Sequence, residues 1–163
     1  MKYLFLSFIA LFVFSFASFA QSPEHERVKK LLAELRKGKD VYTLPDYLSE
    51  DFDDACSKAK KEGKKVLVSL GREECGRCQV FYEFLKKGHI KLDPKKFVYV
   101  KLCIDDLTHK EYFLSTFSPS NNHLPFVGVV DGDRGIEEPC LSGGKTVDDY
   151  HKLMGIEKTA DKK

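Results

Sequence analysis

The sequence predicts one α/β domain in which a mixed β-sheet is covered by helices on both faces. An apolar segment, 66–70, and a segment rich in β-branched and aromatic residues, 97–104, alternate with amphipathic helical patterns, which favours parallel strands. Two further strand-like segments, 126–130 and 136–141, follow each other closely and predict a terminal hairpin. Parallel strands followed by an antiparallel hairpin are typical of a mixed sheet.

Residues 1–20 have the pattern of a secretory signal peptide. Lys2 forms a short basic region, residues 3–16 are almost all apolar, and Ser18-Phe19-Ala20 ends the segment with small residues. The apolar part is shorter than a typical bilayer span. We therefore expect cleavage after Ala20, no membrane attachment afterwards, and a protein that is secreted or retained in the endoplasmic reticulum lumen, or periplasmic if the source is bacterial.

Residues 21–48 are predicted to form an N-terminal helix and a connector. The helix spans 23–36 behind a Ser22 cap, and its apolar residues fall on one face: Val28, Leu31, Leu32 and Leu35. Gly38 ends it, and 39–45 has the composition of a connector. This helix could pack on the domain, mediate a homodimer, or act as a mobile arm, with packing as the default.

The main domain is predicted to span 49–156. A helix capped by Ser49 precedes the strand 66–70 and ends at Gly63. A second helix begins at Gln79 and runs to Gly88, with an apolar face formed by Val80, Phe81, Phe84 and Leu85. After the strand 97–104, Thr108 and Glu111 have the spacing of a capping box for a short helix that ends at Phe117.

The second half of the domain is predicted to be a hairpin followed by a helix. Pro125 precedes the strand 126–130, Asp131-Gly132 indicates a tight turn, and the strand 136–141 returns. Gly143-Gly144 then leads to a last helix with Val147, Tyr150 and Leu153 on its inner face. The polar tail 157–163 has no retention signal resembling Lys-Asp-Glu-Leu.

Composition excludes some classes of partner. The formal net charge is +2 at pH 7, and loss of Lys2 would bring it closer to zero. A chain with so little net charge gives no electrostatic reason to expect binding to nucleic acid or to an anionic membrane. We also expect no cofactor and no metal.

The sequence Cys75-Gly76-Arg77-Cys78 follows the strand 66–70 and opens the next helix. A thiol at a helix N-terminus is stabilised as thiolate, and a cysteine three positions later can form a disulfide with it. We interpret the pair as redox-active, with Cys75 as nucleophile and Cys78 as resolving cysteine. Arg77 favours the thiolate, whereas Glu74 opposes it, so the sign of their net effect is open. A structural zinc site and an inert pair are the alternatives.

Three further cysteines lie outside this pair. Cys56 is on the apolar face of a predicted helix and Cys103 is in a predicted strand, so both are expected in the core. Cys140 lies near the end of the hairpin, where it could be exposed. The odd total of five cysteines leaves an intermolecular disulfide open for it.

The order of these features resembles the thioredoxin fold over residues 49–154: CxxC after a core strand, a proline before a hairpin strand, and a glycine before the last helix. The chain looks most like the secretory-pathway branch of the protein disulfide isomerase family that holds the anterior-gradient proteins and thioredoxin domain-containing protein 12. Three segments carry this likeness, namely the charged run 59–65, Glu73-Glu74-Cys75, and Phe117-Ser118-Pro119.

The resemblance implies a cis peptide bond between Leu124 and Pro125, beside Cys75, where an extended substrate can pair with the backbone. His123, just before Leu124, either lines the substrate rim or is a solvated loop histidine. The chain departs from the family's pattern at Glu74, where an aromatic residue is common, and at Ser69, where a buried carboxylate often assists the resolving thiol. It also contains no tryptophan.

Together these features predict a thiol–disulfide oxidoreductase whose partners are proteins with thiols or disulfides. A binding, chaperone-like or signalling module, in which the CxxC disulfide is only structural, is the alternative. The departures at Glu74 and Ser69 make efficient catalysis doubtful and keep that alternative open.

Overall fold

The computed structural model describes residues 22–44, 49–131 and 135–156. Its four strands are β1 (Lys65–Gly71), β2 (Phe97–Cys103), β3 (Phe126–Asp131) and β4 (Gly135–Ser142), in the sheet order β2-β1-β3-β4. β1 pairs in parallel with β2 and antiparallel with β3, and β3 pairs antiparallel with β4. The predicted mixed sheet with a terminal hairpin is confirmed.

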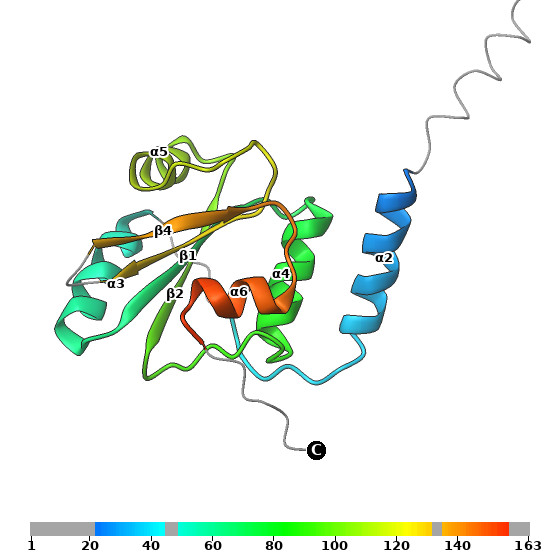
Figure 1. Ribbon diagram of the computed structural model, residues 1–163, viewed down its shortest axis with the longest axis horizontal. Helices are drawn as coiled ribbons and strands as arrows, with labels where there is room; N and C mark the ends of the chain where they lie inside the picture. Colours follow the sequence, from blue (N-terminus) through cyan, green and yellow to red (C-terminus); the bar gives the residue numbers. More distant parts are fainter. Residues whose placement is uncertain (1–21, 45–48, 132–134, 157–163) are drawn as a thin grey trace, which may run out of the picture.

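The described residues form five helices (Figure 1): α2 (Pro23–Leu35), α3 (Ser49–Glu62), α4 (Gly76–Lys86), α5 (Leu107–Thr116) and α6 (Val147–Leu153). α3 and α5 both contact β1 and β2, and α6 contacts β4. α2 lies outside these layers and packs along α4. The N-terminal helix therefore joins the domain through its packing on α4.

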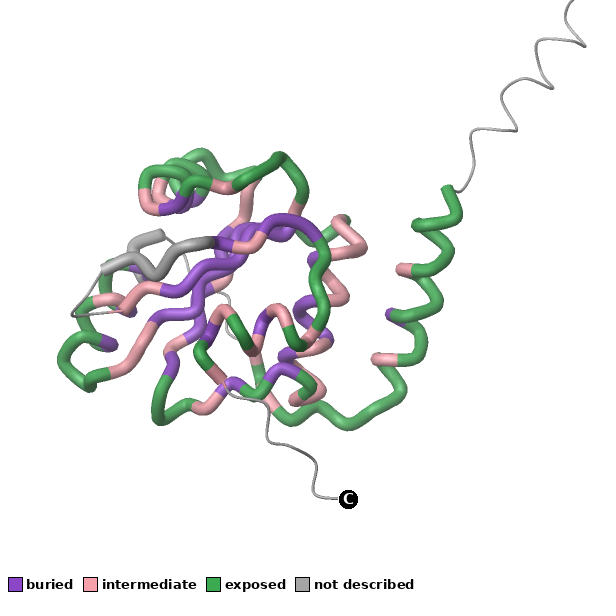
Figure 2. Tube along the Cα trace, viewed as in Figure 1, coloured by how far each residue is buried: buried purple, intermediate pink, exposed green. Residues whose placement is uncertain are grey.

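Two hydrophobic clusters hold the layers together, one on each face of the sheet. Successive side chains of a strand point to opposite faces, so Leu67 enters the first cluster and Val68 the second. The first cluster includes Phe81 of α4 and Tyr150 of α6, and the second includes Phe113 of α5. β1 is buried along almost its whole length (Figure 2), which explains its unbroken apolar sequence.

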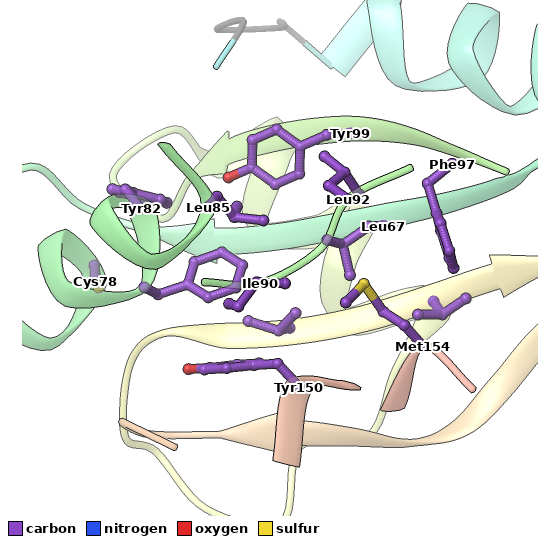
Figure 3. Packing of buried hydrophobic residues seen from close by; sticks show 13 residues of the cluster. Leu67, Cys78, Tyr82, Leu85, Ile90, Leu92, Phe97, Tyr99, Tyr150 and Met154 are labelled. Carbon is purple, nitrogen blue, oxygen red and sulfur yellow. The ribbon is translucent and has the colours of Figure 1, made fainter. Parts of the chain in front are cut away.

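The first cluster runs from the start of α4 to the opposite end of the sheet (Figure 3). Cys78 lies at one end of it, and Phe97 and Met154 lie at the other. The ring of Tyr150 packs against Phe81 with centroids 4.8 Å apart. The CxxC helix is thus anchored by the same core that fixes α6.

α2 begins where the sequence predicted, because Ser22 accepts a hydrogen bond from the backbone N–H of His25 at 3.3 Å. The connector after it follows α4 to its C-terminal end. There the N–H groups of Val41 and Tyr42 donate to the carbonyl of Lys86 at 2.5 and 3.1 Å. The N-terminal segment is therefore attached to α4 at both ends, in agreement with the default expectation of packing.

The predicted capping box of α5 is wrong, because the cap is Asp106 rather than Thr108. The Asp106 carboxylate accepts hydrogen bonds from the N–H groups of Thr108 and His109 at 2.8 and 3.1 Å. These bonds lower the pKa of Asp106, with the bond from His109 as the largest cause. A capping box does occur at α6, where Thr146 and Asp149 exchange hydrogen bonds.

α4 starts earlier than predicted and has a different buried face. It begins at Gly76 rather than Gln79, because Cys75 serves as its cap. Of its predicted apolar positions, Phe81 and Leu85 are buried, whereas Val80 and Phe84 are only half-buried. Tyr82 and Glu83 are buried as well. The reason is that α4 lies between the sheet and α2, and the Arg36 guanidinium that follows α2 is 3.8 Å from the Glu83 carboxylate.

Three predictions lie outside the described residues: the signal peptide 1–20, the turn at Gly132 and the tail 157–163. Among the helices that are described, none combines the length and the apolar character needed to cross a bilayer.

Candidate active site

Cys75 and Cys78 form a disulfide at the N-terminus of α4, with their Cα atoms 5.2 Å apart. Cys75 has extended backbone angles and caps the helix, since its Sγ accepts the N–H of Cys78 at 3.2 Å. Cys75 is half-buried, whereas the Cys78 side chain is fully buried. In the reduced state, the same N–H and the helix dipole would stabilise a thiolate at Cys75.

Gly71, the last residue of β1, lets α4 approach the sheet behind Cys78. A Cβ atom at this position would lie 2.6 Å from Tyr82 Oη and 3.1 Å from Cys78 Sγ. The first distance is shorter than real Cβ contacts and the second is tight, so a larger residue here would force the Tyr82 hydroxyl and the Cys78 sulfur to shift. Tyr82 therefore belongs to the immediate surroundings of the buried sulfur. Sequence analysis missed it, because its position alone does not reveal which way it points.

Ser69 lies two residues before Gly71 on the same face of β1. It is fully buried, and its Oγ is 2.8 Å from the Tyr99 hydroxyl. On β2, Lys101 places its ammonium 5.1 Å from the centre of the Tyr82 ring. Ser69, where a carboxylate was expected to be missing, thus pairs with the Tyr99 hydroxyl, and the Lys101 ammonium group lies nearby.

Removing either hydroxyl of the Ser69–Tyr99 pair should destabilise the fold. We expect Ser69→Ala and Tyr99→Phe each to lower the free energy of unfolding by about 1–3 kcal/mol, since each leaves a buried hydroxyl without this partner. The double variant should lose less than the sum of the two single losses. Urea unfolding of the three variants measures the coupling, and additive losses would contradict a direct bond.

Leu124 and Pro125 lie at the same end of the sheet as the disulfide. Leu70 at the carboxyl end of β1 pairs with Phe126 at the amino end of β3, so the residues before β3 adjoin those after β1. The Leu124–Pro125 peptide bond is cis, and the Pro125 carbonyl accepts the N–H of Gly143 at 2.9 Å. Leu124 is half-buried and packs against both core clusters.

His123 is exposed beside these residues. Its N–H donates to the Asn121 side chain at 2.9 Å, and a Cβ at Gly143 would lie 3.3 Å from its own Cβ. The loop before β3 therefore touches the loop after β4. The predicted rim residues thus gather at one end of the sheet, next to the cysteine pair.

Charged side chains flank the cysteine pair. Arg77, between the two cysteines, pairs with Glu24 of α2, and Arg72 pairs with Asp105 at 2.6 Å. Glu74 is exposed in front of Cys75. Sequence analysis predicted a role for Arg77 and Glu74 but missed Glu24, because no local pattern indicates which residue of a distant helix will meet Arg77.

Gly76 is the other residue between the cysteines, and α2 covers it. A Cβ atom there would lie 2.8 Å from Cγ1 of Val28. Glycine at this position therefore allows α2 to lie directly on the start of α4.

The remaining three cysteines, Cys56, Cys103 and Cys140, are not part of the CxxC disulfide. Cys56 and Cys103 were predicted to be core residues but are only half-buried, whereas Cys140, whose exposure was left open, is 6% exposed. Cys140 is buried because β4 turns this side chain into the second cluster. Burial raises the pKa of Cys56, with a smaller contribution from Asp53, so this thiol stays protonated and poorly reactive.

A metal-binding group and a cavity were the other candidate sites in the described part of the chain. No group of three His, Cys, Asp or Glu side chains that could hold a metal ion occurs among the described residues. A cavity of about 630 Å³ lies where β1 and β2 begin, and it is lined by residues that include Lys65, Lys96 and Phe97. It is at the opposite end of the sheet from Cys75, so we do not assign it to the chemistry of the disulfide.

Comparison with known proteins supports this architecture. No curated protein matches the sequence. Three solved structures share the fold: a disulphide isomerase from Xylella fastidiosa Temecula1 (20% identity, 72% of this chain and 92% of that chain, TM-score 0.50), a thioredoxin from Nicotiana alata (15%, 72% and 98%, 0.52) and a thioredoxin from Thermus thermophilus (21%, 71% and 88%, 0.50).

At these identities, the structures show a common fold and nothing more. The family evidence comes from the sequence itself, because residues 46–132 match the model of the thioredoxin-like family. This match covers more than half of the chain and includes β1, the cysteine pair, α4, β2, α5 and β3. The chain therefore belongs to the thioredoxin-like family.

Proposed function

We propose that the protein is a thiol–disulfide oxidoreductase that acts on the cysteines of client proteins. The observation that carries this proposal is the unequal burial of the two sulfurs at the start of α4. Cys75 is half-buried and caps the helix, whereas Cys78 is fully buried beside Gly71. Such a pair suits exchange, in which one thiol must meet a client and the other must wait behind it.

In the proposed reaction, the Cys75 thiolate attacks a client disulfide and displaces one client sulfur as thiolate. The Cys78 thiol then loses its proton and attacks Cys75, which releases the second client sulfur and forms the Cys75–Cys78 disulfide. Two electrons pass from the protein to the client, which ends as a dithiol. The reverse sequence oxidises a client dithiol, and sequence and fold leave the direction open.

The client would lie along the loop that precedes β3. Leu124 is half-buried there and lies just before β3, at the end of the sheet nearest the disulfide. We propose that an extended client segment pairs with the backbone of this loop, since β3 itself is already paired with β1 and β4. His123 is exposed beside it and is proposed to contact the client.

We also propose that the protein works in the secretory pathway or the extracellular space, or in the periplasm of a bacterium. The apolar segment 3–16 and the small residues 18–20 support export, and an oxidising compartment suits the Cys75–Cys78 disulfide. The segment Glu73-Glu74-Cys75 supports the anterior-gradient branch of the protein disulfide isomerase family as its place within the thioredoxin-like proteins.

A second function has a specific observation in its favour. Ser69 and Tyr99 form a hydroxyl pair where a carboxylate would help to deprotonate the resolving thiol. A protein without that base could use the fold to bind a partner and keep the Cys75–Cys78 disulfide as a structural bond. Exchange would then be slow or absent.

The reduction potential of the Cys75–Cys78 couple separates the two functions. We expect a value between about −270 and −120 mV, the range of oxidoreductases, in a glutathione redox buffer. A value below about −300 mV is typical of structural disulfides and would favour the binding module. The protein for this measurement starts at Gln21 and carries Cys56→Ser and Cys103→Ser. Cys140 is replaced by alanine, because a serine hydroxyl would be buried at that position.

A further inference from the structure

We propose that Glu24 of α2 is a positioning residue of the redox site. By pairing with Arg77, it draws the guanidinium charge away from Cys75 and so lowers the reduction potential of the cysteine pair. This inference rests on the proposed function only in assuming that the pair exchanges with thiols. It makes the N-terminal helix a part of the site, outside the segment 46–132 that defines the family.

Arg77 is held from two sides. Its guanidinium donates to the Glu24 carboxylate, and its aliphatic stem lies against the loop after β4. A Cβ at Gly144 would lie 3.4 Å from Arg77 Cδ and 3.5 Å from Cγ. The Arg77 side chain is 35% exposed and that of Glu24 is 59% exposed. The arginine thus bridges α2 and the loop before α6, and its charged end is directed to α2.

A second contact shows that α2 is fixed at this place. Val28, one helical turn after Glu24, lies directly on Gly76, where even a methyl group would come within 2.8 Å of Cγ1. Both residues between the two cysteines are therefore covered by the same side of α2. A chance contact of one long side chain would not produce this pair of adjacent contacts.

The expected effect of Glu24 follows from charge. Reduction of the pair by glutathione consumes two glutathione thiols and yields two cysteine thiols and one glutathione disulfide, with two electrons transferred. A cation near Cys75 stabilises its thiolate, which favours the reduced protein and raises the potential. A carboxylate bound to that cation reduces this stabilisation. Loss of Glu24 should therefore lower the pKa of Cys75 and raise the potential.

The test compares Glu24→Gln with Glu26→Gln, which removes the same charge from an exposed residue of the same helix. In chemically reduced protein, the pH dependence of alkylation at Cys75, followed by peptide mass spectrometry, gives the pKa of that thiol. We expect Glu24→Gln to lower it by about 0.3–0.7, a two- to fivefold change, because exposed pairs interact weakly. The potential should rise by about 9–21 mV. Glu26→Gln should change neither.

A double-mutant cycle shows whether Glu24 acts through Arg77. In an Arg77→Gln background, Glu24→Gln should no longer change the pKa of Cys75. A role that is only structural would lower thermal stability in both backgrounds and leave this pKa unchanged. Equal effects of the Glu24 and Glu26 variants, or an effect of Glu24→Gln that persists without Arg77, would overturn the proposal.

The test of the Glu24–Arg77 coupling can succeed or fail independently of the proposed function. The pKa of Cys75 can be measured in reduced protein even if the couple does not equilibrate with glutathione or with clients. A potential below about −300 mV with the expected pKa change would refute the oxidoreductase and leave the Glu24–Arg77 coupling standing. An oxidoreductase potential without the pKa change would refute the coupling alone.

Discussion

A Cys78→Ser variant is expected to form one stable mixed disulfide per chain with a client protein and then to stop. Cys75 caps α4 with a half-buried sulfur, so its thiolate can attack a client disulfide without help from Cys78. Release of the client requires a second thiolate behind the first, and serine cannot supply it. Incubation of the reduced variant with a disulfide-containing protein, followed by non-reducing electrophoresis, measures the trapped complex.

The companion variant Cys75→Ser should trap nothing. Cys78 is fully buried beside Gly71 and Tyr82, so it cannot take over the attack on a client. Cys103→Ser is the matched control, because it removes a half-buried thiol and leaves the CxxC pair intact. Loss of the trapped complex when Cys103 is replaced, but not when Cys75 is replaced, would show that the nucleophile is Cys103 rather than Cys75. Client binding that is unchanged in a variant without both CxxC thiols would favour the binding module.

The sequence predicted the elements of the fold well, because their signals are local. Ser22 before the apolar spacing of 28–35 was enough to locate α2, and the apolar run that includes Leu67 and Val68 was enough to locate β1. The cap of α5 is a feature that local sequence signals could not determine. Asp106 and Thr108 are both good caps, and only the folded backbone decides which side chain reaches the free N–H groups.

The candidate site was predicted less completely, since half of it comes from contacts between distant residues. Cys75, Cys78, Arg77 and Pro125 were recognised by spacing or resemblance. Their surroundings were not, because the side of α2 that meets α4 depends on the path of the connector rather than on either helix alone. The contact of Val28 with Gly76 depends on that path. A glycine that no turn requires, such as Gly76, is the one feature of the sequence that indicates another segment packed closely against it.

Gly128 in the middle of β3 is such a glycine, and Gly128→Ala is expected to be among the most destabilising single methyl additions in this chain. A Cβ there would lie 2.5 Å from Cε1 of Phe117 and 2.9 Å from its Cδ1. The Phe117 ring is 1% exposed and packs against Phe113 at a centroid distance of 4.7 Å, so it has little room to move. We expect a loss of about 2–3 kcal/mol of unfolding free energy, since overpacked cores commonly lose this much.

Phe117 caps the C-terminal end of α5 and begins the loop that leads to Leu124 and Pro125, so its displacement should also disturb the proposed client-binding edge. Gly38→Ala is the control for the loss of glycine itself, because its Cβ would lie 3.6 Å from Lys87 Cδ on an exposed surface. It should change stability by less than about 0.5 kcal/mol. Phe117→Leu should rescue part of the Gly128→Ala loss, because it replaces the phenyl ring with a smaller side chain. A double-mutant cycle in urea unfolding would measure this rescue. A Gly128→Ala protein as stable as the wild type would show that Phe117 does not lie over β3, and the loop before Pro125 would then need another anchor.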